Sequence, residues 1–241
     1  MLRSASEMIG YAITASDGNP GTVSDFLFDD QTWRIRWLVA DTGNWLPGRK
    51  LLLPPTALGH PDPKKLAFPV RLTMRQVEES PDILSDRPVS RQDETNTYDY
   101  YGWRPYWDNG FFMGGYGSVA VDRDRDIERS RLNDGDPHLR SVEALTGCHI
   151  HAADGDIGHI EDFLVDDVDW TIHFLVVTTT NWWPGKTVLI PPVSVAAIDW
   201  PERMVNLTVD RQRVKDSPIY DPAAIATWAY TKQFKNHYGD T

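Results

Sequence analysis

The chain of 241 residues carries 24 Lys and Arg against 35 Asp and Glu, a formal net charge of −11 at neutral pH. No segment offers the basic face that binding to a phosphate backbone requires, so we expect no nucleic-acid partner, and an anionic membrane surface is disfavoured for the same reason. The single cysteine, Cys148, excludes an internal disulfide, and no apolar run approaches the roughly 18–20 residues of a membrane span, so we expect a cytoplasmic protein without direct membrane insertion.

The first third of the chain reads as short strands separated by turn residues. The predicted strands cover residues 9–14, 22–28, 33–39, 50–53 and 66–73. In the third, Trp33, Ile35, Trp37 and Val39 alternate with two arginines, which predicts an apolar face with Arg34 and Arg36 on the other side. Strands this short and evenly spaced favour a small closed or half-closed antiparallel barrel, with a small sandwich as the alternative.

A helix is expected after each set of strands. Ser90 is a suitable N-cap for a helix through residues 91–94. Further on, Asp221 followed by Pro222 is a strong start signal for a helix that runs from Ala223 toward Asn236.

The whole pattern returns 137 positions later in the chain. The run at residues 25–30 recurs at 162–167, the Asn-Trp-x-Pro-Gly loop at 44–48 recurs at 181–185, and Pro54-Pro55 recurs as Pro191-Pro192. About a third of aligned positions are identical over roughly eighty residues without a gap, which indicates a duplicated domain. We therefore predict a first repeat over residues 1–102, a linker over 103–137 and a second repeat over 138–241, each repeat ending in its helix.

These motifs, in this order, resemble the PRC-barrel family. The glycine turns, the Asp-Phe-Leu strand, the Trp-x-Ile strand and the Trp-x-Pro-Gly loop occur in both repeats. The resemblance implies a mainly β fold of two tandem small antiparallel PRC-type β-barrels, each followed by a short α-helix. The family occurs in the cytoplasmic part of the photosynthetic reaction-centre H subunit and in a ribosome maturation factor, where it docks on protein. The implied function is a non-enzymatic protein-interaction or scaffold module, similar in role to the H-subunit domain and without a cofactor.

The linker has no counterpart in the second repeat and is rich in aromatic residues. We predict that it binds a protein partner, including a second copy of the chain, through Trp103, Tyr106, Trp107, Phe111, Phe112 and Tyr116. The alternative for the aromatic stretch from Tyr98 to Trp107 is packing between the two barrels.

The second repeat carries the best candidate for a metal site. His149 and His151 stand two apart on a predicted strand and so face one side, with His159 and Asp154 expected on the neighbouring strand. Such a set suits zinc or nickel, and it defines the alternative function, a metal or small-ligand binding protein. Surface histidines on a solvated strand face are the other interpretation.

Acidic residues are also duplicated. Asp29-Asp30 and Asp166-Asp167 could be calcium ligands or catalytic carboxylates, but a turn role is favoured because aspartate is common in turns. Asp25 and Asp162 lie inside strands and are predicted to cap a loop or to pair with a basic residue.

Trp45 and Trp182 are predicted to cover the barrel ends or to contact a partner. Since no nucleophile elbow, phosphate loop or zinc-protease helix is present, a hydrolase is the weakest hypothesis.

Overall fold

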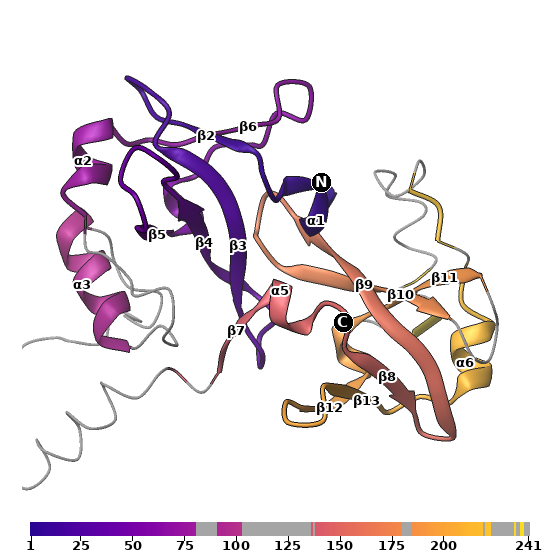
Figure 1. Ribbon diagram of the computed structural model, residues 1–241. Coiled ribbons are helices and arrows are strands. Elements are labelled where there is room, and N and C mark those ends of the chain that lie inside the picture. The colour runs from indigo at the N-terminus through magenta and orange to yellow at the C-terminus, as the bar shows by residue number, and fades with distance from the viewer. Residues whose placement is uncertain are drawn as a thin grey trace, which may run out of the picture.

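The computed structural model describes residues 1–80, 91–102, 136, 138–179, 185–218, 220–222, 234 and 237–238. It is mainly β, with two mixed sheets and a few short helices (Figure 1). The first sheet contains β2 (Ala12–Thr14), β3 (Gly21–Asp29), β4 (Ile35–Asp41), β5 (Lys50–Leu53), β6 (Ala67–Pro69) and β7 (Leu139–Ser141). The second contains β1 (Leu2–Ser4), β8 (His149–Ala152), β9 (Gly155–Asp166), β10 (Ile172–Thr179), β11 (Lys186–Ile190), β12 (Val195–Asp199) and β13 (Met204–Leu207).

The helices are short, and they recur at matching places. They are α1 (Ala5–Met8), α2 (Met74–Glu78), α3 (Arg91–Tyr101), α5 (Val142–Leu145) and α6 (Arg211–Lys215), with 3-10 turns η1 (Pro55–Ala57) and η2 (Pro192–Ser194). The helix predicted from Ser90 is α3. Of the helix predicted from Ala223 toward Asn236, only Phe234 lies within the described residues, and it is helical, as are His237 and Tyr238 just beyond. No helix in the described ranges combines the length and the apolar character needed to cross a membrane.

Each sheet includes one strand from the other repeat. β1 pairs antiparallel with β9, and β7 pairs antiparallel with β3. The two added strands have the same sequence, Leu-Arg-Ser, and the same register, because Ser4 lies opposite Leu164 and Ser141 lies opposite Leu27. The α1 helix consequently lies beside β9, and α5 lies beside β3 (Figure 1). The repeats therefore exchange their leading strands, and neither sheet is complete within one repeat.

The pairing corrects the prediction of antiparallel barrels. β2 pairs with β6 in parallel, and β8 pairs with β13 in parallel, so both sheets are mixed. Each strand from β2 to β5 runs antiparallel to the one before it, so β5 runs opposite to β2. The segment through η1 reverses the chain once more, and β6 therefore runs in the direction of β2. Among the described residues the first sheet runs β5-β4-β3-β2-β6 without a pairing that joins its ends, so hydrogen bonding does not close it into a barrel.

The alternation predicted for residues 33–39 is wrong beyond Ile35, because a β-bulge interrupts it. The β3–β4 register shifts so that Phe28 lies opposite Ile35 but Leu27 lies opposite Trp37, which leaves Arg36 as the extra residue. A one-residue slip moves every later side chain to the other face. Trp37 and Val39 consequently pack against Leu52 and the α3 residue Tyr98 instead of joining Ile35 in the main core. The bulge recurs in β10, where the extra residue is His173.

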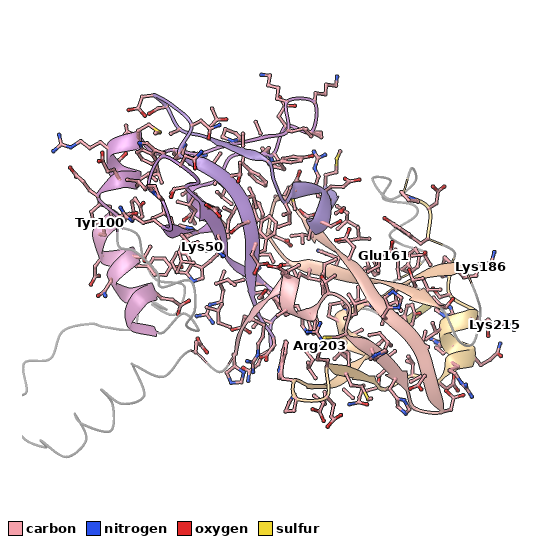
Figure 2. All side chains as sticks on the ribbon, in the orientation of Figure 1. Lys50, Tyr100, Glu161, Lys186, Arg203 and Lys215 are labelled. Atoms are coloured by element: carbon pink, nitrogen blue, oxygen red, sulfur yellow. The ribbon has the colours of Figure 1, made fainter. Side chains whose placement is uncertain are left out.

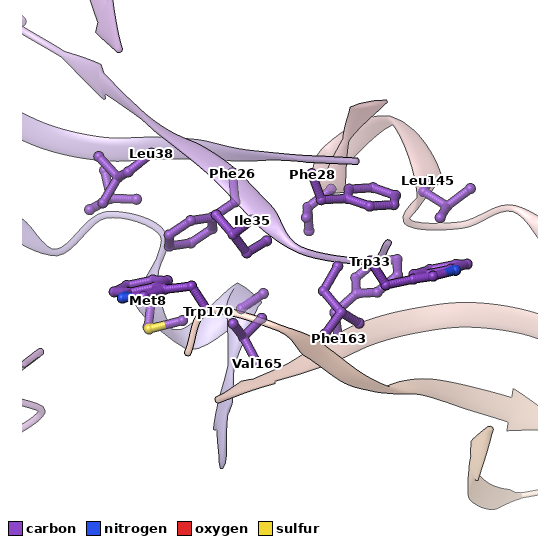
Figure 3. Close-up of a cluster of buried hydrophobic side chains, with 14 of the residues drawn as sticks. Met8, Phe26, Phe28, Trp33, Ile35, Leu38, Leu145, Phe163, Val165 and Trp170 are labelled. Atoms are coloured by element: carbon purple, nitrogen blue, oxygen red, sulfur yellow. The ribbon is translucent and has the colours of Figure 1, made fainter. Parts of the chain in front are cut away.

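One hydrophobic core spans both repeats. Figure 3 shows Phe26, Phe28, Trp33 and Ile35 of the first repeat in one cluster with Phe163, Val165 and Trp170 of the second. The Phe28 ring stacks on Trp33 at 5.4 Å and lies 6.4 Å from Phe163, while Phe26 lies 6.2 Å from Trp170. Burial of large apolar side chains is the main stabilising term in folding, so the two repeats share the source of their stability.

Candidate functional site

The seam between the repeats begins at two tryptophans in an unusual backbone conformation. Trp33 and Trp170 have φ of 57° and 58°, a region that bulky residues rarely occupy. This conformation aims their carbonyl groups at the other repeat. The Trp170 carbonyl accepts from the Ile35 amide at 2.7 Å, and the Trp33 carbonyl accepts from the Ile172 amide at 2.8 Å. Two reciprocal hydrogen bonds thus join the β3–β4 turn to the β9–β10 turn.

The duplicated aspartates inside the strands hold the exchanged strands in place. Asp25 is 9% exposed and accepts hydrogen bonds from the Ser141 hydroxyl at 2.6 Å and from the Glu143 amide at 3.2 Å. Burial raises the pKa of Asp25 above its ordinary value, against the effect of these hydrogen bonds. Asp162 accepts in the same way from the Ser4 hydroxyl and from the amide of Ser6 at 2.9 Å. Both aspartates therefore bind the N-cap serine and a first-turn amide of the first helix of the opposite repeat, rather than a loop or a basic residue as predicted.

The turn aspartates bind the same exchanged strands. Asp30 accepts from Arg140 Nε at 3.0 Å and lies 2.9 Å from the His138 imidazole. Asp167 accepts from Arg3 Nε at 3.1 Å and from the amino group of Met1 at 2.6 Å. Asp29 accepts from the Thr32 amide of its own turn at 2.9 Å and from Arg36 Nη1 at 3.4 Å. The observed contacts are therefore those of seam and turn residues, with one ion pair from Asp29 to Arg36.

The three candidate metal ligands do not converge. The β8–β9 register puts His149 opposite His159, but His151 lies beside Asp156, with Nδ1 2.7 Å from its carboxylate. Asp154 accepts from the Arg211 amide at the start of α6. Within the described residues no group of three or more metal-ligating side chains is arranged around a common point. A site at His149, His151 and His159 stays a prediction, which metal analysis and thermal shifts with zinc and nickel would test.

The aromatic partner-binding residues from Trp103 to Tyr116 lie outside the described residues. The aromatic residues just before them pack on their own repeat. The Tyr98 ring lies 4.9 Å from Trp37, and the Tyr100 and Tyr101 hydroxyls donate to the Gln76 carbonyl at 3.2 and 3.4 Å. Figure 2 labels Tyr100 on α3, beside the first sheet. Trp45 packs partly buried on the core, as expected of a residue that covers it, whereas Trp182 is not among the described residues.

A buried charge network lies beneath α3. Arg36, which is 5% exposed, donates from Nη2 to both oxygens of Glu94 at 2.6 and 2.7 Å and from Nη1 to Asp136 at 2.9 Å. Glu94 is fully buried and also accepts from the Trp37 indole at 2.6 Å. We call Arg36, Glu94, Asp136 and Trp37 the arginine clasp. The clasp fastens α3 and Asp136, which lies three residues before β7, to the bulge in β4.

Two grooves follow the seam at positions related by the repeat. Groove A, of about 330 Å³, lies between the turn at Gln31 and Trp33 and the segment from Pro192 to Trp200. Groove B, of about 430 Å³, lies between the turn from Asp167 to Trp170 and the segment from Pro55 to His60. Each contains one strongly exposed valine, Val193 at 54% in groove A and Val168 at 70% in groove B. Beside groove A, the Arg140 guanidinium stacks on the Trp200 ring at 4.4 Å.

The fold defines the class of the protein: it is mainly β, with two mixed sheets that each include one strand from the other repeat. A PRC-barrel domain is found at residues 2–70. The match begins at β1, the strand that the structure places in the sheet of the other repeat, and it ends just after β6. A comparison with curated proteins finds no match.

Sequence reasoning missed both the strand exchange and the seam. The signal available was the tripeptide Leu-Arg-Ser, which recurs at positions 2–4 and 139–141. It marks these residues as part of the repeat, but a tripeptide does not say in which sheet it lies. The grooves were missed for the same reason, since they form between segments of different repeats.

Proposed function

We propose that the chain is a non-enzymatic protein-interaction module, a cytoplasmic scaffold whose second repeat is also a PRC-type unit. The PRC-barrel domain at residues 2–70 supports this proposal, because the family resemblance implies docking on protein. The contacts that recur 137 positions later support a like unit in the second repeat: Asp25 with Ser141 corresponds to Asp162 with Ser4.

The observation that carries the proposal is the pair of seam grooves. Each is built on a turn held by reciprocal backbone hydrogen bonds, so its walls are fixed before a partner arrives. A preorganised surface loses less entropy on association than a flexible one. Each groove exposes an apolar side chain beside its fixed turn, Val193 in groove A and Val168 in groove B, and burial of exposed apolar surface favours association. We therefore propose that a partner protein inserts apolar side chains into groove A, groove B or both.

Site-specific photo-cross-linking tests this proposal. A photoreactive residue at Val193 or Val168 of the full chain is expected to give a discrete cross-linked product in cells. Leu66 is the matched control, because it is an equally exposed apolar residue, at 58%, and lies outside both grooves. A second experiment in groove A places the photoreactive residue at Gln31. The cross-linked product from Gln31 is expected to disappear when Val193→Asp is added.

Two results would contradict docking at the seam. One is the absence of a discrete product from both valines. The other is an equal product from Leu66, which would indicate nonspecific contact. Analytical ultracentrifugation of the purified chain separates a foreign partner from a second copy, since a self-association interface would also change the sedimentation coefficient with concentration.

A further inference from the structure

The open edge of the second sheet lies along groove A. β12 is the last strand in the order of that sheet, and among the described residues it pairs with β13 alone (Figure 1). Four successive residues of β12, from Val195 to Ile198, line the groove. Because successive residues of a strand point to opposite faces, such a groove follows the edge of the strand and not one face of the sheet. Ala196 and Ala197 are exposed and small, so the backbone of β12 is accessible from groove A.

The register of β12 indicates which backbone groups face the groove. Asp199 lies opposite Met204, and the matching pair in the first repeat, Asp62 and Ala67, exchanges both backbone hydrogen bonds, at 2.8 and 3.2 Å. In an antiparallel ladder such pairs alternate with pairs whose amides and carbonyls point away from each other. The amide and carbonyl of Ile198 therefore point to the open side of the strand. Within the described residues no backbone hydrogen bond from outside the sheet reaches them.

The first repeat blocks the same edge. Residues 58–62 stand at the matching positions, and in place of a strand they form isolated bridges at Leu58 and Asp62. Pro61 occupies the position of Ile198 and has no amide hydrogen to donate. Proline and interrupted strands are devices by which proteins protect a sheet edge from pairing with another chain. The second repeat lacks this protection, so its open edge is a specific difference between the repeats.

The end of β12 presents an acidic corner. Asp199 and Glu202 are exposed, and the Asp199 carboxylate accepts from the Glu202 amide at 3.1 Å. In the part of the chain that the structure describes, neither carboxylate forms an ion pair. The neighbouring Arg203 donates from its guanidinium to the Thr146 carbonyl at 3.2 Å. A basic side chain on a partner would therefore meet complementary charge at this corner.

We propose that the edge of β12 in groove A binds an extended segment of a partner protein as an added strand, with a Lys or Arg of that segment beside Asp199 and Glu202. An extended backbone presents donors and acceptors at the spacing of a sheet edge, so the main chain supplies affinity and the side chains supply specificity. A second copy of the chain fits less well, because each copy carries a net charge of −11 and β12 has no basic residue. The proposal rests on the docking function proposed above and names the kind of segment that groove A receives.

Titration of the full chain with three synthetic peptides tests strand addition. The parent probe is acetyl-Lys-Thr-Val-Thr-Val-Lys-amide. Two further peptides carry N-methyl groups on alternate residues, one on the odd-numbered and the other on the even-numbered amides. A strand uses one alternate set of amides toward a given neighbour, so one methylated peptide is expected to bind about tenfold more weakly than the parent and the other nearly as well. No saturable binding of the parent, or equal binding of the two methylated peptides, would overturn the proposal.

Substitutions at the edge supply matched variants. Ile198→Pro copies Pro61 of the first repeat and removes the outward donor, so it is expected to weaken the parent peptide by about three- to tenfold. Ile198→Val keeps the amide and an apolar side chain and is expected to bind like the wild type; equal weakening by both variants would overturn the assigned role of the amide. Glu202→Gln is expected to weaken the parent by about two- to fivefold and to leave unchanged a peptide with Gln in place of both lysines. Circular dichroism establishes whether each variant is folded, and the methylated peptides test the wild type if Ile198→Pro is not.

Cross-linking from Val193 separates this proposal from the docking function. If the partner adds a strand, the product from a photoreactive residue at Val193 is expected to be lost with Ile198→Pro and kept with Ile198→Val. A product that persists with Ile198→Pro overturns strand addition and leaves docking at groove A in place. Peptide binding without a product from Val193 supports the edge as a strand acceptor and counts against docking in the cell. Sedimentation that depends on concentration and is restored to a monomer by Ile198→Pro assigns the edge to a second copy and overturns the foreign partner.

Discussion

Removal of the Ser141 hydroxyl measures the strength of the seam, and Ser4 supplies a control within the same chain. Both serines cap a short helix, through the Ala144 amide at 2.9 Å and the Glu7 amide at 3.0 Å, and loss of such a cap costs about 1 kcal/mol. Ser141 also donates to the buried carboxylate of Asp25, and loss of a hydrogen bond to a charged group costs about 1.5–3 kcal/mol. Ser141→Ala is therefore expected to lower the free energy of unfolding by about 2.5–4 kcal/mol.

The Ser4→Ala variant is expected to lower the free energy of unfolding by only about 1–2 kcal/mol, because Asp162, the acceptor of the Ser4 hydroxyl, has other donors. Asp162 is less buried than Asp25 and keeps the amide and hydroxyl of Ser6, both at 2.9 Å. Urea unfolding at pH 7, monitored by tryptophan fluorescence, gives both values, and an unchanged m-value shows that the same surface is exposed. If Ser4→Ala destabilises the chain as much as Ser141→Ala does, the account of Asp25 as the more dependent acceptor is wrong.

Three further predictions concern the exchanged strands and the clasp. Cleavage at a protease site inserted between residues 103 and 135 is expected to leave the two halves together in size-exclusion chromatography, because they share one core; separation of the halves would contradict the strand exchange. Because burial raises the pKa of Asp25, its contribution to stability is greatest below the unfolded pKa of about 3.9 and is lost as the pH rises through the raised value. The stability of the wild type relative to Asp25→Asn should therefore fall as the pH rises above about 4, and a flat or rising difference would reject this assignment. Arg36→Met leaves Glu94 buried without its cation and is expected to lower the free energy of unfolding in urea by about 3–5 kcal/mol. The control His173→Met, at the matching position of the second repeat, should lower it by under about 1 kcal/mol. Equal values would show that the clasp does not act as a unit.

The sequence predicted the order of the strands along the chain better than it predicted which strands pair with each other. Turn residues and alternation locate strands because they depend on local backbone preferences, and β2 to β6 fall close to the predicted positions. Which strand lies beside β9 depends on contacts more than 150 positions away, as in the hydrogen bonds from Ser4 to Asp162, and no local pattern encodes them. The duplication singled out Asp25 and Asp162, but the serines and helix starts that they bind could not be identified from the strand pattern.

The burial of Arg36 shows a second limit of pattern reading. Alternation assigned Arg36 to the outer face, yet the bulge turns it inward beneath α3. A bulge adds one residue without changing composition or hydrophobicity, so periodicity cannot place it in advance. The same shift places Trp37 beside Tyr98 of α3 and Phe174 beside Phe234. At that point the first repeat has the charged arginine clasp, whereas in the second repeat Phe174 packs against Phe234.

The strand exchange also explains where the two repeats are able to differ. Residues at the seam serve both halves, since Asp25 of one repeat holds Ser141 of the other and Asp162 holds Ser4, and these four residues are the same in both copies. A homodimer of a single repeat would have two identical outer ends, because its interface is symmetric. Two repeats in one chain are not bound by that symmetry. At one end Arg36 forms the arginine clasp, and at the matching place in the second repeat Phe174 packs against Phe234, so covalent linkage allows one symmetric seam to carry two unlike ends.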